Sequence, residues 1–341
     1  IDLEVSVVET ANKSNVVAKI SVMNAPGRTF WGNDFDAGVR IQECYATAGK
    51  YLAKYLKKGG YVVIESTINP GVCDEVVIPI LEKATSLKAG VDFDLAHCPE
   101  RINPGDPKWN VYNIPRNIGS TRLQATEFLA EFYRSFISGA INEMPDIKTT
   151  EATKIVENTF RDINIAFVNE LAKSFHVLGI DTMTVIRAAS NKPFAFMPHY
   201  PSCGVGGHCI PVDPYYLIER AGKSGFDHKF LKIAREINNS MPAYTVELLA
   251  DALNRYCKPI KGTDIGLLGL SYKADVSDLR ESPSLKILEI LEQKGANIHI
   301  FDPYFQEKNN VASLDELLEK SFAILLATNH SPFKEINAQR L

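Results

Sequence analysis

A cysteine on a glycine-rich loop is the feature of this sequence that most directly suggests chemistry. Cys209 closely follows Gly206 and Gly207, and glycine has no side chain to keep a substrate away from the sulfur. Asp213 comes four residues later, so one helical turn would bring its carboxylate to the Cys209 side. Because the thiolate is the nucleophile and polar neighbours such as His208 tune the pKa of a thiol, the pattern favours covalent catalysis. The alternative is a buried structural cysteine behind a flexible loop.

The composition restricts the class of protein. A chain of 341 residues can form two or three domains. Its 37 basic and 41 acidic residues give a net charge of −4 without a basic block, which argues against a nucleic-acid partner. No apolar run approaches the ~20 residues of a membrane helix. Six scattered cysteines without a Cys-x-x-Cys pair predict neither a disulfide framework nor a metal site, and they fit a cytoplasmic location. Both ends of the sequence look like cut edges of a longer chain.

In the first part of the chain, predicted strands alternate with predicted helices, as in an α/β fold. These elements would position the candidate functional residues. After a strand at 19–23 and a helix at 34–56, short apolar runs predict buried strands at 61–64 and 93–96, with a helix at 73–83 between them. A polar loop with Ser66 and Thr67 follows the first of these two strands, and one with Glu100 follows the second. Ligands of parallel α/β sheets bind at such carboxyl ends. The alternatives are that Thr67 caps a helix and that Glu100 is a solvated acid.

A dinucleotide-binding fold ordinarily begins with Gly-x-Gly-x-x-Gly after a first strand. No such stretch precedes Asp34, and residues 1–33 are too short for the two strands and the helix that it needs. The sequence therefore predicts the second half of a dinucleotide fold without the first.

Residues 149–178 have the strongest helical periodicity in the chain. The apolar face is formed by Ala152, Ile155, Val156, Phe160, Ile163, Phe167, Leu171 and Phe175. Lys154 and Asn158 are four residues apart and lie on one side of this helix. Their alternative reading is a solvated lysine and a spare amide.

A further helix is predicted at 221–256, and a second α/β region follows it. Strands are predicted at 264–270, 297–301 and 322–327, and a helix at 282–294 is capped by Ser282 with Pro283 at its first position. The loop 273–282 between them carries both charges, and its simplest reading is a solvated loop.

The sequence of residues 204–213 resembles the catalytic cysteine signature of the UDP-glucose/GDP-mannose dehydrogenase family. It reads Gly-Val-Gly-Gly-His-Cys-Ile-Pro-Val-Asp. Further motifs between about Asp34 and His330 resemble the family in the same order. The resemblance implies an α/β fold in which two Rossmann-like parallel-sheet domains are joined by a helical central domain with a long helix. The expected domains are a partial NAD-binding domain at 1–145, the central domain with the cysteine loop at 146–256, and a partial UDP-binding domain at 257–341.

The resemblance also implies the reaction. Members oxidise the C6 alcohol of a nucleotide sugar to a carboxylate with two NAD+ in succession, through a thiohemiacetal and a thioester on the cysteine, here Cys209. Asp213 would assist proton transfer, Lys154 and Asn158 would hold the oxyanion, and Thr67 and Glu100 would order the hydrolytic water. An alternative of another class is a non-catalytic nucleotide-sugar-binding subunit, motivated by the absent glycine fingerprint.

Residues 191–201 and Val212 resemble the sequences of the family branch that oxidises UDP-N-acetylhexosamines. UDP-glucose is the alternative substrate. The resemblance implies substrate contacts from Arg101, Ile102, Asn103, Arg161, Phe194, Phe196, Tyr200, Gly206, Gly207, Tyr272 and Lys273. It implies NAD contacts from Ser66, Thr67, Glu100, Cys209 and Arg280. Two departures are Ser202-Cys203, where the family usually has Gly-Pro, and the lack of a second acid shortly after Glu100. The apolar face of the long helix favours a homodimer.

Overall fold

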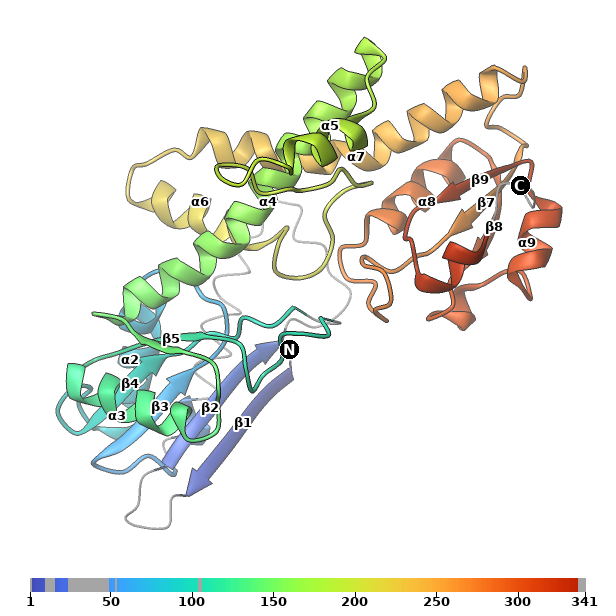
Figure 1. Ribbon diagram of the computed structural model, residues 1–341. Helices are drawn as coiled ribbons and strands as arrows, with labels where there is room; N and C mark the ends of the chain where they lie inside the picture. Colours follow the sequence, from blue (N-terminus) through green and yellow to red (C-terminus); the bar gives the residue numbers. More distant parts are fainter. Residues whose placement is uncertain (1, 10–15, 24–48, 53, 104–105, 337–341) are drawn as a thin grey trace. The chain divides into compact units, whose positions relative to one another are not determined.

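The computed structural model describes residues 2–9, 16–23, 49–52, 54–103 and 106–336 (Figure 1). The chain divides into two compact units, one formed by Ile1–Glu157 with Glu219–Gly225 and the other by Asn158–Ile218 with Phe226–Leu341. Each unit contains its own sheet, and the long helix α4 (Ile147–Leu178) contributes residues to both. The fold class predicted from the sequence, α/β with two parallel sheets and a long central helix, is confirmed.

The sheet of the first unit has the order β1-β2-β3-β4-β5-β6. Its strands are β1 (Asp2–Glu9), β2 (Val16–Met23), β3 (Gly60–Ile64), β4 (Phe93–His97), β5 (Arg116–Ser120) and β6 (Ile141–Glu143). The strands predicted at 19–23, 61–64 and 93–96 are confirmed as β2, β3 and β4. These three strands pair in parallel, as do β5 and β6. Antiparallel pairing of β1 with β2 and of β4 with β5 adds two contacts that the sequence pattern does not predict.

Both faces of this sheet are covered, because side chains alternate along a strand. Val62 and Ile64 pack against η1 (Cys73–Val77) and α2 (Ile78–Thr85), which together confirm the predicted helix at 73–83. Val63 points the other way, toward α3 (Leu123–Arg134). Of the helix predicted at 34–56, residues 49–52 are helical and most of the rest lies outside the described residues. The carboxyl edge of the sheet is thus fixed by a core on either side.

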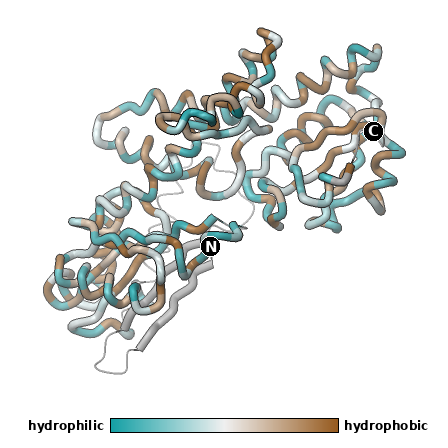
Figure 2. Tube along the Cα trace, viewed as in Figure 1, coloured by the Kyte–Doolittle hydropathy of each residue, from teal (hydrophilic) through white to brown (hydrophobic). Residues whose placement is uncertain are grey.

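The second unit combines helices with a three-stranded parallel sheet of order β8-β7-β9. Its strands are β7 (Asp264–Leu268), β8 (Asn297–Phe301) and β9 (Ala323–Leu326). Figure 2 shows that these strands consist largely of apolar residues, drawn in brown. The helices that lie wholly in this unit are α5 (Thr182–Ala189), α7 (Lys229–Asn254), α8 (Pro283–Gln293) and α9 (Leu314–Lys320), with short 3-10 helices η2 (Gln306–Lys308) and η3 (Ser331–Glu335). The predicted strands are confirmed, and so is the cap of α8, where the Ser282 side chain accepts from the Ser284 backbone N–H.

The single helix predicted over 221–256 is wrong. The chain forms α6 (Asp213–Lys223) and then α7, which begins only at Lys229. Gly225 between them has a φ of +88°, a left-handed conformation that ends a helix and that glycine adopts without strain. Periodicity alone did not reveal this break.

The long helix α4 confirms the prediction at 149–178 but differs from it in the nature of its buried side. The buried polar residues of α4 include Glu151, Lys154, Asn158, Asp162 and Asn169, each 8% exposed or less. Several apolar residues of the predicted face are instead half exposed: Val156 at 57%, Phe160 at 47% and Phe167 at 53%. Since buried polar groups need partners, α4 must form specific bonds along its length.

Candidate functional site

In the first unit, the loops that carry Thr67 and Glu100 leave the sheet side by side. Strands β3 and β4 are parallel and end in register, Ile64 opposite His97. The Cys98 backbone N–H donates to the Ile64 carbonyl at 2.9 Å, and the Glu100 N–H donates to the Glu65 carbonyl at 3.2 Å. The structure therefore brings both predicted loops to one sheet edge, where α/β sheets bind ligands.

Thr67 does not cap the helix that follows, because the N-cap of η1 is Val72. That helix end is served from α4 instead. The buried carboxylate of Glu151 accepts from the backbone N–H groups of Gly71, at 2.5 Å, and of Cys73, at 2.9 Å. Burial raises the pKa of Glu151, and the two backbone bonds oppose that rise. A side chain of α4 thus holds the end of the Thr67 loop in place.

His97, at the end of β4, is a residue for which the sequence alone predicted no role. Its fully buried ring donates from Nε2 to the Ser66 carbonyl at 3.0 Å, so it fixes the other end of the same loop. Burial, together with the charge of Lys154, lowers its pKa to about 4, although the bond to Ser66 acts in the opposite direction. Lys154 is itself 8% exposed, so the reading of a solvated lysine is wrong. The structure places its ammonium charge near the edge that carries Ser66.

Glu100 is not a solvated loop acid. Its Oε1 accepts from the backbone N–H groups of Arg101 and Ile102, both at 2.7 Å, and its Oε2 accepts from Arg116. Three of its four lone-pair positions are therefore taken by the protein. Whatever Glu100 does toward a ligand, it does from a fixed position.

Of the neighbouring residues predicted to bind substrate, Arg101 is engaged by the protein. Its guanidinium contacts both carboxylate oxygens of Glu157, at 3.1 and 2.7 Å, and donates to the Pro115 carbonyl at 2.9 Å. Ile102 is 38% exposed and Asn103 is half-buried. A cavity of about 400 Å³ is lined by Arg101, Trp109, Ile114, Pro115, Asn142 and Glu157.

In the second unit, the structure builds the predicted turn at the cysteine. The Asp213 N–H donates to the Cys209 carbonyl at 2.9 Å, so the two residues are one turn apart at the start of α6. The Asp213 carboxylate is 2% exposed and accepts from the Asn158 side-chain amide at 2.5 Å. Asn158 is therefore not a spare amide. Three predicted site residues, Asn158, Asp213 and Cys209, belong to one connected group.

The glycines before Cys209 have a packing role as well as an accessibility role. A Cβ on Gly206 would lie 2.6 Å from the Tyr272 Cβ and 2.8 Å from the Glu281 carbonyl oxygen. Gly207 has a φ of +87°, and its N–H donates to the Arg280 carbonyl at 2.9 Å. The loop can pack against 272–281 only because these positions lack side chains.

A buried relay connects the same loop to two helices. The Asp162 carboxylate accepts from Arg235 Nη1 and from the Asn238 amide, at 2.5 and 2.8 Å. The Asn238 oxygen accepts from Asn169 at 2.9 Å, and the Asn169 oxygen accepts from the Ser202 N–H at 2.8 Å. Sequence reasoning missed this relay, because its members are separated by 33 to 76 residues and no local pattern joins them.

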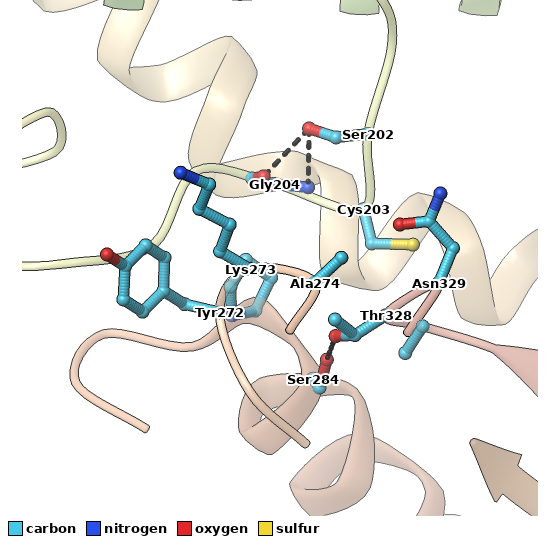
Figure 3. A pocket seen from close by; sticks show the side chains of 11 residues that line it. Ser202, Cys203, Gly204, Tyr272, Lys273, Ala274, Ser284, Thr328 and Asn329 are labelled. Carbon is cyan, nitrogen blue, oxygen red and sulfur yellow. Dashed lines mark hydrogen bonds between the residues drawn. The ribbon is translucent and has the colours of Figure 1, made fainter. Parts of the chain in front are cut away.

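A second cavity, of about 270 Å³, lies beside the start of the cysteine loop (Figure 3). Its lining is Ser202, Cys203, Gly204, Tyr272, Lys273, Ala274, Pro283, Ser284, Ala327, Thr328 and Asn329. Cys203 and Cys209 form no disulfide, and burial raises the pKa of Cys203, so its thiol stays protonated at neutral pH. Two predicted substrate residues, Tyr272 and Lys273, line this cavity.

The charged loop 273–282 is tied down from within and from the sheet. Arg280, predicted to contact NAD, donates from Nε and Nη2 to Asp278, at 3.0 and 2.6 Å. The Asp275 N–H donates to Nδ1 of buried His330, whose Nε2 donates to Asp302 at 3.2 Å. The reading of an ordinary solvated loop is therefore wrong.

At the end of β8, Asp302 is fully buried. Its carboxylate accepts from the backbone N–H groups of Leu270 and Ser271, at 2.6 and 3.1 Å, in the turn after β7. These bonds and the bond from His330 lower its pKa far below the usual range, although burial acts in the opposite direction. The turn after β7 therefore already holds an anion of the protein itself.

None of the aromatic residues at 191–201, predicted to line the sugar pocket, lines either of the two cavities described above. Phe194 is 67% exposed and Tyr200 is 48% exposed, whereas Phe196 is half-buried. Burial raises the pKa of Tyr272, and the charge of Arg161, which is exposed on α4, acts in the opposite direction.

Two absences concern the described residues alone. They contain no group of three or more histidine, cysteine, aspartate or glutamate side chains that could hold a metal ion. Within the same ranges, no helix combines the length and apolar character of a membrane span.

Replacing His97 by glutamine should flatten the acid side of the stability profile. The folded-state pKa of about 4 lies below the unfolded value near 6.5, so the unfolded state binds the extra proton between them. The free energy of unfolding of the wild type therefore falls as pH drops through this window, by about 1.4 kcal/mol per unit. Urea unfolding at pH 7 and pH 5 should show His97→Gln losing less stability than the wild type. His176→Gln, at an exposed position, is the control, and identical pH dependence in all three proteins would contradict the assignment.

Comparison with known proteins places the chain in a family. The UDP-glucose/GDP-mannose dehydrogenase family matches at residues 39–137 with its NAD binding domain, at 148–240 with its central domain and at 266–341 with its UDP binding domain.

Comparison with individual proteins leads to the same family. The chain is 36% identical over 306 residues to UDP-N-acetyl-D-glucosamine 6-dehydrogenase of Pseudomonas aeruginosa, covering 86% of this chain and 71% of that protein. It is 40% identical over 288 residues to UDP-N-acetyl-D-mannosamine dehydrogenase of Pyrococcus horikoshii, covering 84% and 66%. A solved UDP-D-ManNAc dehydrogenase from Pyrococcus horikoshii matches with a TM-score of 0.80 and 37% identity, over 87% of this chain and 68% of that one. The chain thus spans about two thirds of the length of these relatives. It belongs to the UDP-glucose/GDP-mannose dehydrogenase family of NAD-dependent nucleotide-sugar dehydrogenases.

Proposed function

We propose that this protein oxidises the C6 hydroxymethyl group of a UDP-N-acetylhexosamine to a carboxylate. The single observation that carries the proposal is the connected group of Asn158, Asp213 and Cys209. The amide of Asn158 donates to the buried Asp213 carboxylate, one turn from Cys209. The link to Cys209 runs through its backbone carbonyl, which places the thiol one turn from the carboxylate. A thiol at that spacing can add to a carbonyl, and the amide donor can stabilise the charge that develops.

In the proposed mechanism, bound NAD+ would accept the hydride in each of the two oxidations. The Ser66–Thr67 and Glu100 loops, at the carboxyl ends of adjacent parallel strands, fit such a cofactor. Cys209 adds to the C6 aldehyde, forming a carbon–sulfur bond while the carbonyl oxygen takes up negative charge. Lys154 and the Asn158 amide stabilise that oxygen. Asp213 accepts the thiol proton as the carbon–sulfur bond forms. Loss of the C6 hydride to the second NAD+ would turn the thiohemiacetal into a thioester. Water then breaks the carbon–sulfur bond, the sulfur takes back the proton from Asp213, and the proton that the water loses goes to solvent.

The acetamido sugar is proposed on two grounds. The relatives described above are named for UDP-N-acetyl-D-glucosamine and UDP-N-acetyl-D-mannosamine. The position before Asp213 is Val212, where the resemblance to UDP-glucose oxidisers would require a lysine. A cytoplasmic location and a homodimer through α4 belong to the same proposal, and the half-exposed Phe160 and Phe167 support the dimer.

Cys209→Ala in the full-length protein should abolish uronate formation. Without the nucleophile there is no thioester, and the loss should be at least about 10³-fold. Cys257→Ala, at an exposed cysteine, is the matched control and should retain wild-type turnover. NADH absorbance measures both. Normal turnover by Cys209→Ala would refute the mechanism and favour a non-catalytic binding subunit.

Cys209→Ser should behave differently from the alanine variant. A serine hydroxyl can add to the aldehyde, but the resulting ester is a poorer acyl donor than a thioester. We expect a covalent sugar adduct to accumulate, visible in the intact mass of the protein. Absence of an adduct together with full turnover would contradict the acyl-enzyme.

UDP-N-acetylglucosamine or its C2 epimer should exceed UDP-glucose in kcat/KM by at least ~10²-fold, about 2.7 kcal/mol of transition-state binding. A pocket that hydrogen-bonds the acetamido group leaves its own polar groups unpaired when glucose enters. Steady-state NADH assays with each sugar give the ratio. Equal or faster turnover of UDP-glucose would assign the protein to the other branch.

Phe160→Glu should convert a dimer into a monomer in sedimentation velocity. A charge at the centre of an apolar interface between α4 helices must be desolvated without a partner. Val91→Glu, at a position 78% exposed in the other unit, should leave the dimer intact. A wild-type protein that sediments as a monomer would remove this part of the proposal.

A further inference from the structure

A buried arginine connects the two loops that carry Thr67 and Glu100. Arg116 is the first residue of β5, and its side chain is 6% exposed. Strand β5 runs antiparallel to β4, with Ala96 opposite Ser120 and His97 opposite Gly119. Continuing this register carries Arg116 to the level of Glu100, just beyond the carboxyl end of β4. The topology therefore delivers the guanidinium to the edge where the candidate site lies.

The guanidinium contacts one carboxylate from each loop. Its Nη2 donates to Glu100 Oε2. Its Nη1 forms no hydrogen bond with the described residues but makes an ion pair at 3.8 Å with Oε1 of Glu65, the residue that directly precedes Ser66. The Tyr133 hydroxyl donates to the same Glu65 oxygen at 2.7 Å, and its ring lies 5.9 Å from the guanidinium carbon. One cation thus links the start of the first loop to the centre of the second.

The chemistry of this contact requires arginine. A planar guanidinium presents several N–H groups in fixed directions and can serve two carboxylates at once, whereas a lysine ammonium acts as a point charge. Without the cation, two carboxylates would face each other in a largely buried place, where unpaired charge is costly. Glu100 in turn holds the backbone N–H groups of Arg101 and Ile102, so its position sets the course of the following residues.

We propose that Arg116 is a positioning residue of the dehydrogenase, which fixes the Thr67 loop and the Glu100 loop relative to each other by pairing with Glu65 and Glu100. It acts through these carboxylates and contacts no substrate itself. The inference rests on the proposed function, since it assigns Arg116 to the geometry of that reaction.

Arg116→Lys in the full-length protein tests the proposal. The variant keeps the charge but loses the two-directional contact, so the loops can shift. A shift of about 1 Å can cost up to about 10²-fold, so we expect kcat to fall about 10- to 100-fold. The KM for the UDP-sugar should change less than about threefold, because a loss confined to the transition state lowers kcat alone.

Arg122→Lys is the matched control. Arg122 also donates from Nε and Nη2 to a buried carboxylate on β4, that of Asp94, at 2.9 and 2.5 Å. Asp94 is the second residue of β4, at the opposite end of the strand from Glu100. This variant should lose stability and keep the wild-type kcat. An equal loss of kcat in Arg122→Lys would show a general structural effect and overturn the proposal.

Hydrogen exchange supplies a readout that does not need activity. The amides of Arg101 and Ile102 should exchange faster in Arg116→Lys and at the wild-type rate in Arg122→Lys. Unchanged exchange, or a kcat within threefold of the wild type, would overturn the role of Arg116. If the wild type oxidises no UDP-sugar, the proposed function fails, while the exchange rates still decide whether Arg116 holds the loop.

Tyr133→Phe covers the case in which Arg116→Lys does not fold. It removes the hydroxyl that donates to Glu65 and that also interacts with the Cys98 thiol, while Glu65 keeps its contact with Arg116. We expect kcat to fall about 3- to 10-fold with an unchanged KM, in line with the loss of roughly 1 kcal/mol from one hydrogen bond. An unchanged kcat in a folded Tyr133→Phe would overturn the part of the proposal in which the position of Glu65 matters for the reaction.

Discussion

The need to pair buried polar side chains on one long helix governs the candidate site. On α4, Glu151 holds the backbone at Gly71 and Cys73, Asn158 donates to Asp213, and Asn169 accepts from the Ser202 N–H. Leaving one buried polar group unpaired costs about 1–3 kcal/mol, so the folded state with each of these contacts formed is clearly favoured over one without it. The same helix therefore sets the loop after β3 in one unit and the cysteine loop in the other.

This arrangement explains why apolar residues of α4 remain half exposed. A helix that uses its inward side for carboxylates and amides has to place Phe160 and Phe167 elsewhere. The buried pair of Asp162 and Arg235 shows what that choice entails. Removing one partner of such a pair typically costs about 3–5 kcal/mol, because the other charge stays buried without compensation.

Much of the fold and part of the site follow from local sequence signals. The β-branched run at 61–64 and the cap at Ser282 each depend on neighbouring residues, and both were predicted correctly. The turn from Cys209 to Asp213 also follows from a spacing of four. His97 and Arg116 could not be found this way, because their partners lie 31 and 16 residues away and the bonds exist only once β3, β4 and β5 are aligned. The break at Gly225 was missed because helical periodicity resumes after it.

The carboxylate of Asp302 has a consequence for the C-terminal sheet. In dinucleotide-binding folds, backbone N–H groups in the turn after the first strand receive the pyrophosphate. Here the N–H groups of Leu270 and Ser271 receive Asp302 instead. A diphosphate bound by this domain would therefore have to be held by groups other than these two N–H groups, because Asp302, itself bonded to His330, already occupies them. In the C-terminal sheet, the turn where a dinucleotide fold ordinarily binds its pyrophosphate is thus filled by a carboxylate of the protein itself.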